Sequence, residues 1–265
     1  MKPWNVVERV LAPDGTEMTL VQRDGEYVVR YAGKVLMSTR QHASEEALAT
    51  LAFELIDDSK GDKKAEPKTV LVGGMGLGYT ARAALDRLSR GGKVLIAEFT
   101  PEIVHWNEKH VGAFARHPLA DPRVRVQLGD AVALIYSSTN LYDLILLDID
   151  NGPSGMVHAA NQRLYGDRGI AACHRALKPG GVLAVWSSDP DSPYLKRLER
   201  GGFAASSKNI AARGDSGGVR HVIFLGLRRE PSKNQLAKAT VDNPLGAPRG
   251  RQKPRPPRGS VRTRR

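Results

Sequence analysis

The chain has 265 residues, a net charge of +12 and 41% hydrophobic residues. This length fits one large domain, or one domain with a small appendage, and the apolar fraction suffices for a packed core. No apolar run approaches the ~20 residues that a membrane span needs, so no membrane segment is predicted. The N-terminal MKPWNVVERV lacks the apolar stretch of a secretory signal, and the single Cys173 cannot form an internal disulfide. Both observations predict a cytoplasmic protein.

The positive charge is concentrated at the C-terminal end. Residues 229–265 contain eleven Lys or Arg and two acidic residues, which accounts for +9 of the +12. The segment is also rich in proline and glycine and offers almost nothing to bury, so it is predicted to be a disordered basic tail. Weak contact with nucleic acid is therefore expected from the tail and not from the folded part.

The first 60 residues have the pattern of a small β-structure followed by a helix. Residues 1–37 alternate apolar and polar positions and carry turn signals at Asp24-Gly25 and Gly33. This pattern predicts an antiparallel β meander. Apolar residues at helical spacing then predict a helix over 44–58 with Ser44 as its N-cap. The polar stretch that follows is interpreted as a linker, so the first domain is expected to span residues 1–60.

From Lys68 onward, short apolar strands alternate with helices. Strands are expected at 69–74, 93–99, 123–130, 143–150 and 182–188, and helices at 79–90, 101–114, 131–138, 161–178 and 192–202. The alternation predicts an α/β fold with a parallel sheet and helices on both faces. Two further strands, 203–212 and 219–229, are separated by the turn-rich RGDSGG and predict a closing hairpin. The expected fold is the Rossmann-like seven-stranded methyltransferase fold over 61–228, with the basic tail at 229–265.

A glycine-rich loop joins the first strand of this region to its helix. In VLVGGMGLGYTARAAL, the loop glycines are Gly74, Gly76 and Gly78. Glycine lets the backbone turn sharply and approach a ligand closely, and a helix N-terminus offers free N–H groups to an anion. Residues 76–81 also satisfy the G-x-G-x-x-G/A fingerprint of dinucleotide-binding proteins. The loop alone therefore leaves a nicotinamide cofactor open.

Three acidic residues follow successive strands. Glu98, Asp130 and Asp148 each stand at the carboxyl end of an expected strand, where open α/β sheets bind ligands. Glu98 is placed to accept hydrogen bonds from two ribose hydroxyls, and Asp130 from an adenine amino group. One such acid alone would be interpreted as a helix cap or a solvated loop residue. Three of them behind a glycine loop favour S-adenosylmethionine or its decarboxylated relative.

Five segments together resemble the spermidine synthase (polyamine aminopropyltransferase) branch of the methyltransferase superfamily, from about residue 14 to 228. They are VLVGGMGLGYTAR, IAEFTPEIV, VQLGDAVALI, YDLILLDIDNGP and LYGDRGIAACHRALKPGGVLAVW. The resemblance implies cofactor roles for Glu98 and Asp130 and puts Asp148 where the family keeps its acceptor-amine base. It also implies a small-molecule acceptor such as a polyamine. Related folds are often dimers, so a homodimer is among the expectations.

The departures from the family pattern concern the transferred group. The family places an aspartate in the glycine loop where this chain has Leu77, and it has D-x-x-D where this chain has Asp148-Ile149-Asp150-Asn151. The ammonium of decarboxylated S-adenosylmethionine needs acidic anchors, whereas a buried aspartate would repel the carboxylate of S-adenosylmethionine. Leu77 therefore favours methyl transfer to a small amine or other nucleophile, with Asp148 or Asp150 holding the acceptor nitrogen. The alternative is aminopropyl transfer, with Asp150 or Glu45 as a shifted anchor.

Two further alternatives stay open at the level of sequence. One is a nucleic-acid-associated methyltransferase that uses the basic tail as a tether. The other is a relative that binds the cofactor without catalysing a reaction. The His, Cys and Asp residues show no spacing typical of a metal site, so no metal is predicted.

Overall fold

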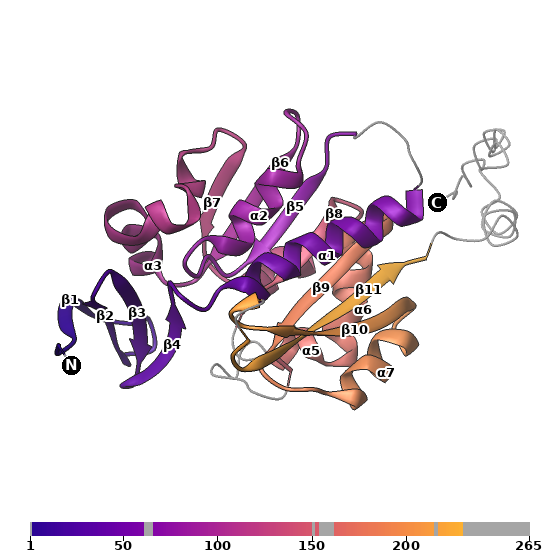
Figure 1. Ribbon diagram of the computed structural model, residues 1–265. Helices are drawn as coiled ribbons and strands as arrows, with labels where there is room; N and C mark the ends of the chain where they lie inside the picture. The colour runs from indigo at the N-terminus through magenta and orange to yellow at the C-terminus, as the bar shows by residue number, and fades with distance from the viewer. Residues whose placement is uncertain (1, 61–65, 150–151, 154–161, 215–216, 230–265) are drawn as a thin grey trace, which may run out of the picture. The chain divides into compact units, whose positions relative to one another are not determined.

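Two β-sheets of different kinds form the described part of the chain (Figure 1). The computed structural model describes residues 2–60, 66–149, 152–153, 162–214 and 217–229. The first sheet is N-terminal, has four strands and is antiparallel, and the second has seven strands and is mostly parallel. The second sheet carries the carboxyl ends of the strands at which a site was expected.

The N-terminal sheet is a meander in the order β1-β2-β3-β4. Its strands are β1 (Asn5–Leu11), β2 (Glu17–Arg23), β3 (Glu26–Tyr31) and β4 (Lys34–Ser38). Two tight turns, Asp24-Gly25 and Ala32-Gly33, have positive φ at both residues. Such turns match the twist of the strands that they join. The expected meander is confirmed.

The seven-stranded sheet has the order β10-β11-β9-β8-β5-β6-β7. Its strands are β5 (Thr69–Gly73), β6 (Lys93–Glu98), β7 (Val124–Leu128), β8 (Tyr142–Leu147), β9 (Leu177–Ser187), β10 (Phe203–Ala211) and β11 (Arg220–Arg228). β5 to β9 pair in parallel, and β11 pairs antiparallel with both β9 and β10. The expected fold with its closing hairpin is confirmed. The chain moves outward from β5 to β7 and then returns to β8, so the strand order reverses between β5 and β8, where ligands of open α/β sheets bind.

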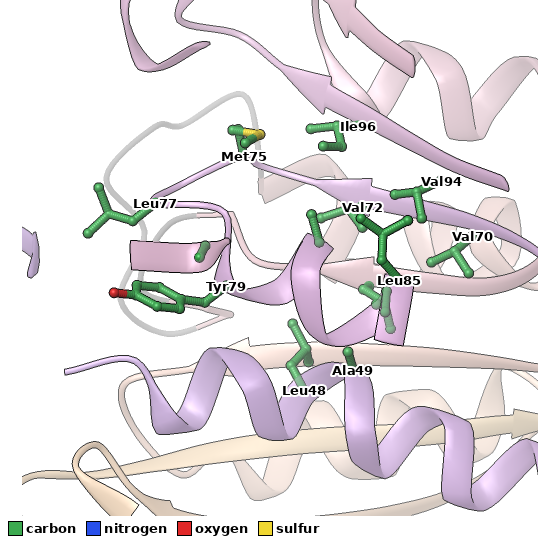
Figure 2. Close-up of a cluster of buried hydrophobic side chains, with 14 of the residues drawn as sticks. Leu48, Ala49, Val70, Val72, Met75, Leu77, Tyr79, Leu85, Val94 and Ile96 are labelled. Carbon is green, nitrogen blue, oxygen red and sulfur yellow. The ribbon is translucent and has the colours of Figure 1, made fainter. Parts of the chain in front are cut away.

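Helices cover both faces of this sheet. They are α1 (Ala43–Lys60), α2 (Tyr79–Arg87), α3 (Pro101–Trp106), α4 (Ala131–Ser137), α5 (Gln162–Tyr165), α6 (Asp167–Ala176) and α7 (Ser192–Arg200). Alternate residues of a strand face opposite sides. Val70 and Val72 accordingly pack with α1 and α2 (Figure 2), whereas Leu71 lies in the cluster that contains α4, α6 and α7. Buried apolar layers thus fix the strand ends from both sides.

The segment expected as one helix over 101–114 is instead three short pieces. α3 ends at Trp106, a π-helical turn covers Asn107–Val111, and a 3₁₀ turn covers Gly112–Ala115. The buried Asn107 explains the change, because its amide donates to the Gly76 carbonyl at 2.8 Å and to the Ile103 carbonyl at 2.9 Å. This side chain ties the turn to the glycine loop.

Two other boundaries differ from those expected. The helix expected over 161–178 is divided at Gly166 into α5 and α6, and β9 already begins at Leu177. α1 begins at Ala43, so Ser44 lies in its first turn and is not the N-cap. The Ser44 hydroxyl instead donates to Glu45 at 2.6 Å and lies 2.9 Å from Nδ1 of His221.

α1 packs against α2, β9 and β11, which are elements of the seven-stranded sheet region. The domain boundaries expected after residues 60 and 228 stay predictions, and so does the disorder of the tail, because residues 230–265 lie outside the described residues. In the part of the chain that the structure describes, no helix is long and apolar enough to cross a membrane.

Candidate functional site

A cavity of about 410 Å³ opens at the carboxyl ends of β5, β6, β7 and β8. This volume lies in the usual range for small-molecule sites. The strand ends and their loops contribute the cavity wall on one side, namely Gly74, Met75, Gly76, Leu77, Gly78, Glu98, Asp130 and Asp148. The meander and α1 contribute Ala12, Met18, Tyr31, Leu36, Met37 and Glu45. The cavity therefore lies where the strand order reverses between β5 and β8, and residues of the N-terminal sheet form part of its wall.

The glycine loop passes directly over Asp148. Gly74 has φ 86°, and a Cβ at this position would lie 2.3 Å from the Asp148 carbonyl oxygen. Gly78 has φ 89°, begins α2, and would bring a Cβ to 2.8 Å from Cγ of Pro118. Only glycine combines this backbone conformation with such close approach. Leu77, which stands between them on the glycine loop (Figure 2), is buried and lines the cavity.

Gly74→Ala should destabilise the fold by roughly 2–4 kcal/mol, because the strained φ adds to a clash with backbone that cannot move aside. The matched control is Gly33→Ala, at φ 75° with nothing within 4 Å of the new Cβ. That variant should cost only about 1–2 kcal/mol for the backbone conformation. Urea unfolding of both variants measures the difference. Equal losses of stability would show that the loop does not press on Asp148.

Glu98 ends β6 and is buried, with 7% of its surface exposed. Its two carboxylate oxygens accept hydrogen bonds from the backbone N–H of Met75 at 2.8 Å and of Thr100 at 2.7 Å. Burial raises the pKa of Glu98, and these backbone donors partly oppose the rise. Since a carboxylate has about four acceptor sites, both oxygens can still accept from ligand hydroxyls.

Asp130 lies between β7 and α4 and lines the same cavity. Its Oδ1 accepts a hydrogen bond from the N–H of Val132 at 2.7 Å, which makes Asp130 the N-cap of α4. The cap uses one carboxylate oxygen. A role as cap and a role toward a ligand are therefore compatible at this residue.

Asp148 follows β8 and lies next to Glu45 of α1. The Thr80 hydroxyl donates to Oδ2 of Asp148 at 2.7 Å and lies 3.2 Å from the Glu45 carbonyl oxygen. Burial raises the pKa of Asp148 to about 6, against the opposing effect of the Thr80 hydroxyl. Burial, followed by the charge of Asp148, raises the pKa of Glu45 to about 8. The two carboxyls therefore titrate as a coupled pair, which at neutral pH holds about one proton and carries about one negative charge.

The structure brings most of the predicted site residues into one cavity. Those that line it are Gly74, Gly76, Gly78, Glu98, Asp130 and Asp148. Asp150 lies outside the described residues. Sequence reasoning missed Thr80 and Ser44, which orient the two carboxyls. A threonine in the first turn of a helix after a glycine loop gave no signal, because its partner Asp148 is 68 residues away.

The comparisons with known proteins agree with one another. The model of the spermine/spermidine synthase domain matches residues 42–198, more than half of the chain. The polyamine aminopropyltransferase 2 of Pseudomonas aeruginosa is 30% identical over 181 residues, which are 64% of this chain and 50% of that protein. The polyamine aminopropyltransferase of Nitrosomonas europaea is 34% identical over 135 residues, 50% of this chain and 40% of that protein. The chain thus spans about half the length of the curated relatives it matches.

A solved structure has a similar fold. The spermidine synthase of Thermotoga maritima superposes with a TM-score of 0.66 and 18% identity, over 87% of this chain and 75% of that one. At this identity the likeness concerns the fold alone.

These findings contradict the prediction of methyl transfer, because the curated relatives are named polyamine aminopropyltransferases and the matching family model is that of spermine and spermidine synthases. The prediction relied on Leu77, which removes an acid from the glycine loop. The structure shows why that inference fails, since Glu45 enters the same cavity from α1 and lies beside Asp148. An acidic pair is present without an acid at position 77. The chain belongs to the spermine/spermidine synthase domain family.

Proposed function

We propose that this chain is an aminopropyltransferase that uses decarboxylated S-adenosylmethionine and a polyamine-type primary amine. The observation that carries the proposal is the pair of carboxyls, Glu45 and Asp148, beside the glycine loop in one cavity. Both substrates are cationic amines at neutral pH, and a pair of carboxyls attracts them. The same pair would repel the carboxylate of S-adenosylmethionine.

The nucleoside part of the substrate is assigned to the strand ends on the other side of the loop. Glu98, already fixed by two backbone N–H groups, is proposed to accept hydrogen bonds from the ribose hydroxyls. Asp130 is proposed to accept from the adenine amino group through the oxygen that the helix cap does not use. Gly74, Gly76 and Gly78 leave room for the ligand to approach the backbone. These hydrogen bonds to carboxylates are worth roughly 1.5–3 kcal/mol each.

The reaction is a displacement at the carbon bonded to the sulfonium sulfur. The amine nitrogen forms the new C–N bond, the C–S bond breaks with its electron pair on sulfur, and methylthioadenosine leaves. Before the attack, the ammonium of the acceptor gives one proton to the carboxylate of Asp148, which leaves the neutral amine that forms the bond. The protein contributes by holding a neutral amine in line with the carbon, and a base whose pKa lies near the working pH suits that task.

Mass spectrometry of reaction mixtures tests the proposal. The full chain, with decarboxylated S-adenosylmethionine and putrescine, should yield one aminopropylated product and one methylthioadenosine per turnover. A panel of longer and shorter diamines identifies the acceptor. S-adenosylmethionine in place of the decarboxylated substrate should bind more weakly and give no methylated amine. A methylated product, or binding of both substrates without any product, would overturn the proposal.

Other expectations about partners rest on the sequence alone and stay proposals. They are a homodimer, a cytoplasmic location in keeping with the one buried free cysteine, Cys173, and weak phosphate contact through the basic tail. Measuring the affinity for nucleic acid at several salt concentrations tests the contact through the tail. If the tail binds phosphate groups by counterion release, the affinity should fall steeply as the salt concentration increases.

A further inference from the structure

Three side chains of metal-binding type meet beside the N-terminal sheet, outside the lining of the cavity described above. Glu8 extends from β1, His105 from α3 and His110 from the π-helical turn. Nε2 of His110 lies 2.6 Å from Oε1 of Glu8, and Nε2 of His105 lies 3.6 Å from the same oxygen. One ligand atom from each of the three lies within 4.8 Å of the other two.

The π-helical turn is what brings the two histidines together. Residues five apart on an α-helix point about 140° away from each other, since each residue turns the chain by about 100°. The wider i→i+5 turn over Asn107–Val111 brings such residues toward the same side. The centroids of the two imidazole rings are consequently 6.4 Å apart, and the angle between the ring planes is 82°. Both rings can therefore direct a nitrogen to one point.

A buried indole orients the carboxylate. Nε1 of Trp106 donates to Oε2 of Glu8 at 2.7 Å, and Trp106 itself is only 1% exposed. This bond fixes one oxygen of Glu8 and directs the other toward the histidines. An outer hydrogen bond of this kind is typical of carboxylates that bind metals.

We propose that Glu8, His105 and His110 bind one Zn²⁺ ion, with the fourth position left to water. Two imidazoles and one carboxylate are an established zinc ligand set, with bonds of about 2.0–2.2 Å. Tetrahedral ligands at that distance lie roughly 3.3 Å apart. The two separations that involve Glu8, 2.6 and 3.6 Å, each differ from this value by less than about 1 Å, and the third ligand pair lies within 4.8 Å. Imidazole ligands favour zinc over Mg²⁺ and Ca²⁺, which prefer oxygen. The side chains are 26% to 49% exposed, so an ion can reach them from solvent.

The consequence of such a site would be structural. Glu8 belongs to the meander, and the histidines follow the segment from Thr100 to Ile103, which lines the cavity. Ala12 and Met18 of the meander also line the cavity. A bound ion would therefore join the two walls of the cavity at a point outside it.

Calorimetric titration of the metal-free, untagged full chain with zinc chloride tests the proposal. One zinc ion per chain should bind, magnesium chloride should give no binding heat, and zinc should raise the Tm. His105→Asn and His110→Asn should each weaken zinc binding at least about 10-fold. Loss of a residue that only hydrogen-bonds to a metal ligand already weakens binding by about this factor, and these histidines are proposed as ligands themselves. Glu8→Gln should weaken it too, although glutamine can still accept from Trp106.

The matched control is His117→Asn, in the same region of the chain. His117 is exposed and has φ 48°, a conformation that asparagine tolerates. This variant should bind zinc as the unsubstituted chain does, and circular dichroism of all variants reports their folding. Absence of zinc binding, or unchanged binding by a folded His105→Asn/His110→Asn double variant, would overturn the proposal.

Discussion

Asp148→Asn should lower kcat roughly 10²- to 10⁴-fold, the usual effect of a positioned general base. Asparagine keeps the size of the side chain and an oxygen that can accept from Thr80, so the fold should be preserved. Binding of decarboxylated S-adenosylmethionine should weaken far less than kcat falls, because the substitution removes one negative charge of the carboxyl pair but none of the groups assigned to the nucleoside. Steady-state kinetics, with equilibrium binding of decarboxylated S-adenosylmethionine as a second measurement, separates these two effects.

The pH profile distinguishes a base from a structural residue. Asp148 must be ionised to accept a proton, and its pKa is about 6, so kcat/KM should fall as the pH is lowered through this value. The Thr80 hydroxyl lowers that pKa, so Thr80→Val should move the acid limb to higher pH, and Thr80→Ser should restore it. A folded Asp148→Asn variant with nearly normal kcat would mean that the acceptor is held elsewhere, with Asp150 as the next residue to test.

Strand periodicity predicted the fold because the central strands β5, β6 and β8 of the large sheet are largely buried on both faces. β5 and β6 were recognised within one residue and β8 within three for this reason. The division of residues 101–115 into three short pieces was not recognised. The sequence of this segment has a helical pattern, whereas its conformation depends on one contact with a distant part of the chain. Asn107 donates to the carbonyl of Gly76, 31 residues away, and no local pattern reports that bond.

The candidate site divides in the same way. Glycines after a strand and acids at strand ends are local signals, and they led to Gly74, Glu98 and Asp130, which the structure places in the lining of one cavity. The role of Leu77 was misjudged because charge at a site is a sum over all segments that enter it. Glu45 lies 32 positions before Leu77 on a helix outside the strand–loop pattern, and only packing of α1 against the sheet brings it to Asp148.

Glu45→Gln should stabilise the folded chain above pH 8 and leave its stability nearly unchanged at pH 4. The pKa of Glu45 rises from 4.5 to about 8 on folding, so the folded state retains a proton that the unfolded state loses as the pH rises above 4.5. Stability must therefore fall between these two pH values, and the penalty is complete above about 8. Glutamine carries no charge and avoids it. Each pKa unit corresponds to about 1.4 kcal/mol, and solvent screening in the open cavity reduces the gain to roughly 1–3 kcal/mol.

A competing effect works in the opposite direction. Glu45 lies in the first turn of α1, where the helix dipole favours a negative charge by roughly 0.3–1 kcal/mol. A raised pKa of Glu45 means that burial and repulsion by Asp148 cost the charged side chain more than the helix dipole stabilises it. The sign of the change in unfolding free energy of Glu45→Gln at high pH therefore shows which effect is larger. The control is Glu54→Gln on the same helix, an exposed residue with Arg87 3.9 Å away, which should change stability by less than about 0.5 kcal/mol at every pH. Urea unfolding of both variants at pH 4, 7 and 9 gives the comparison. If Glu45→Gln were destabilising at pH 9, or if its effect did not change with pH, the two carboxyls would not share a proton in the folded state.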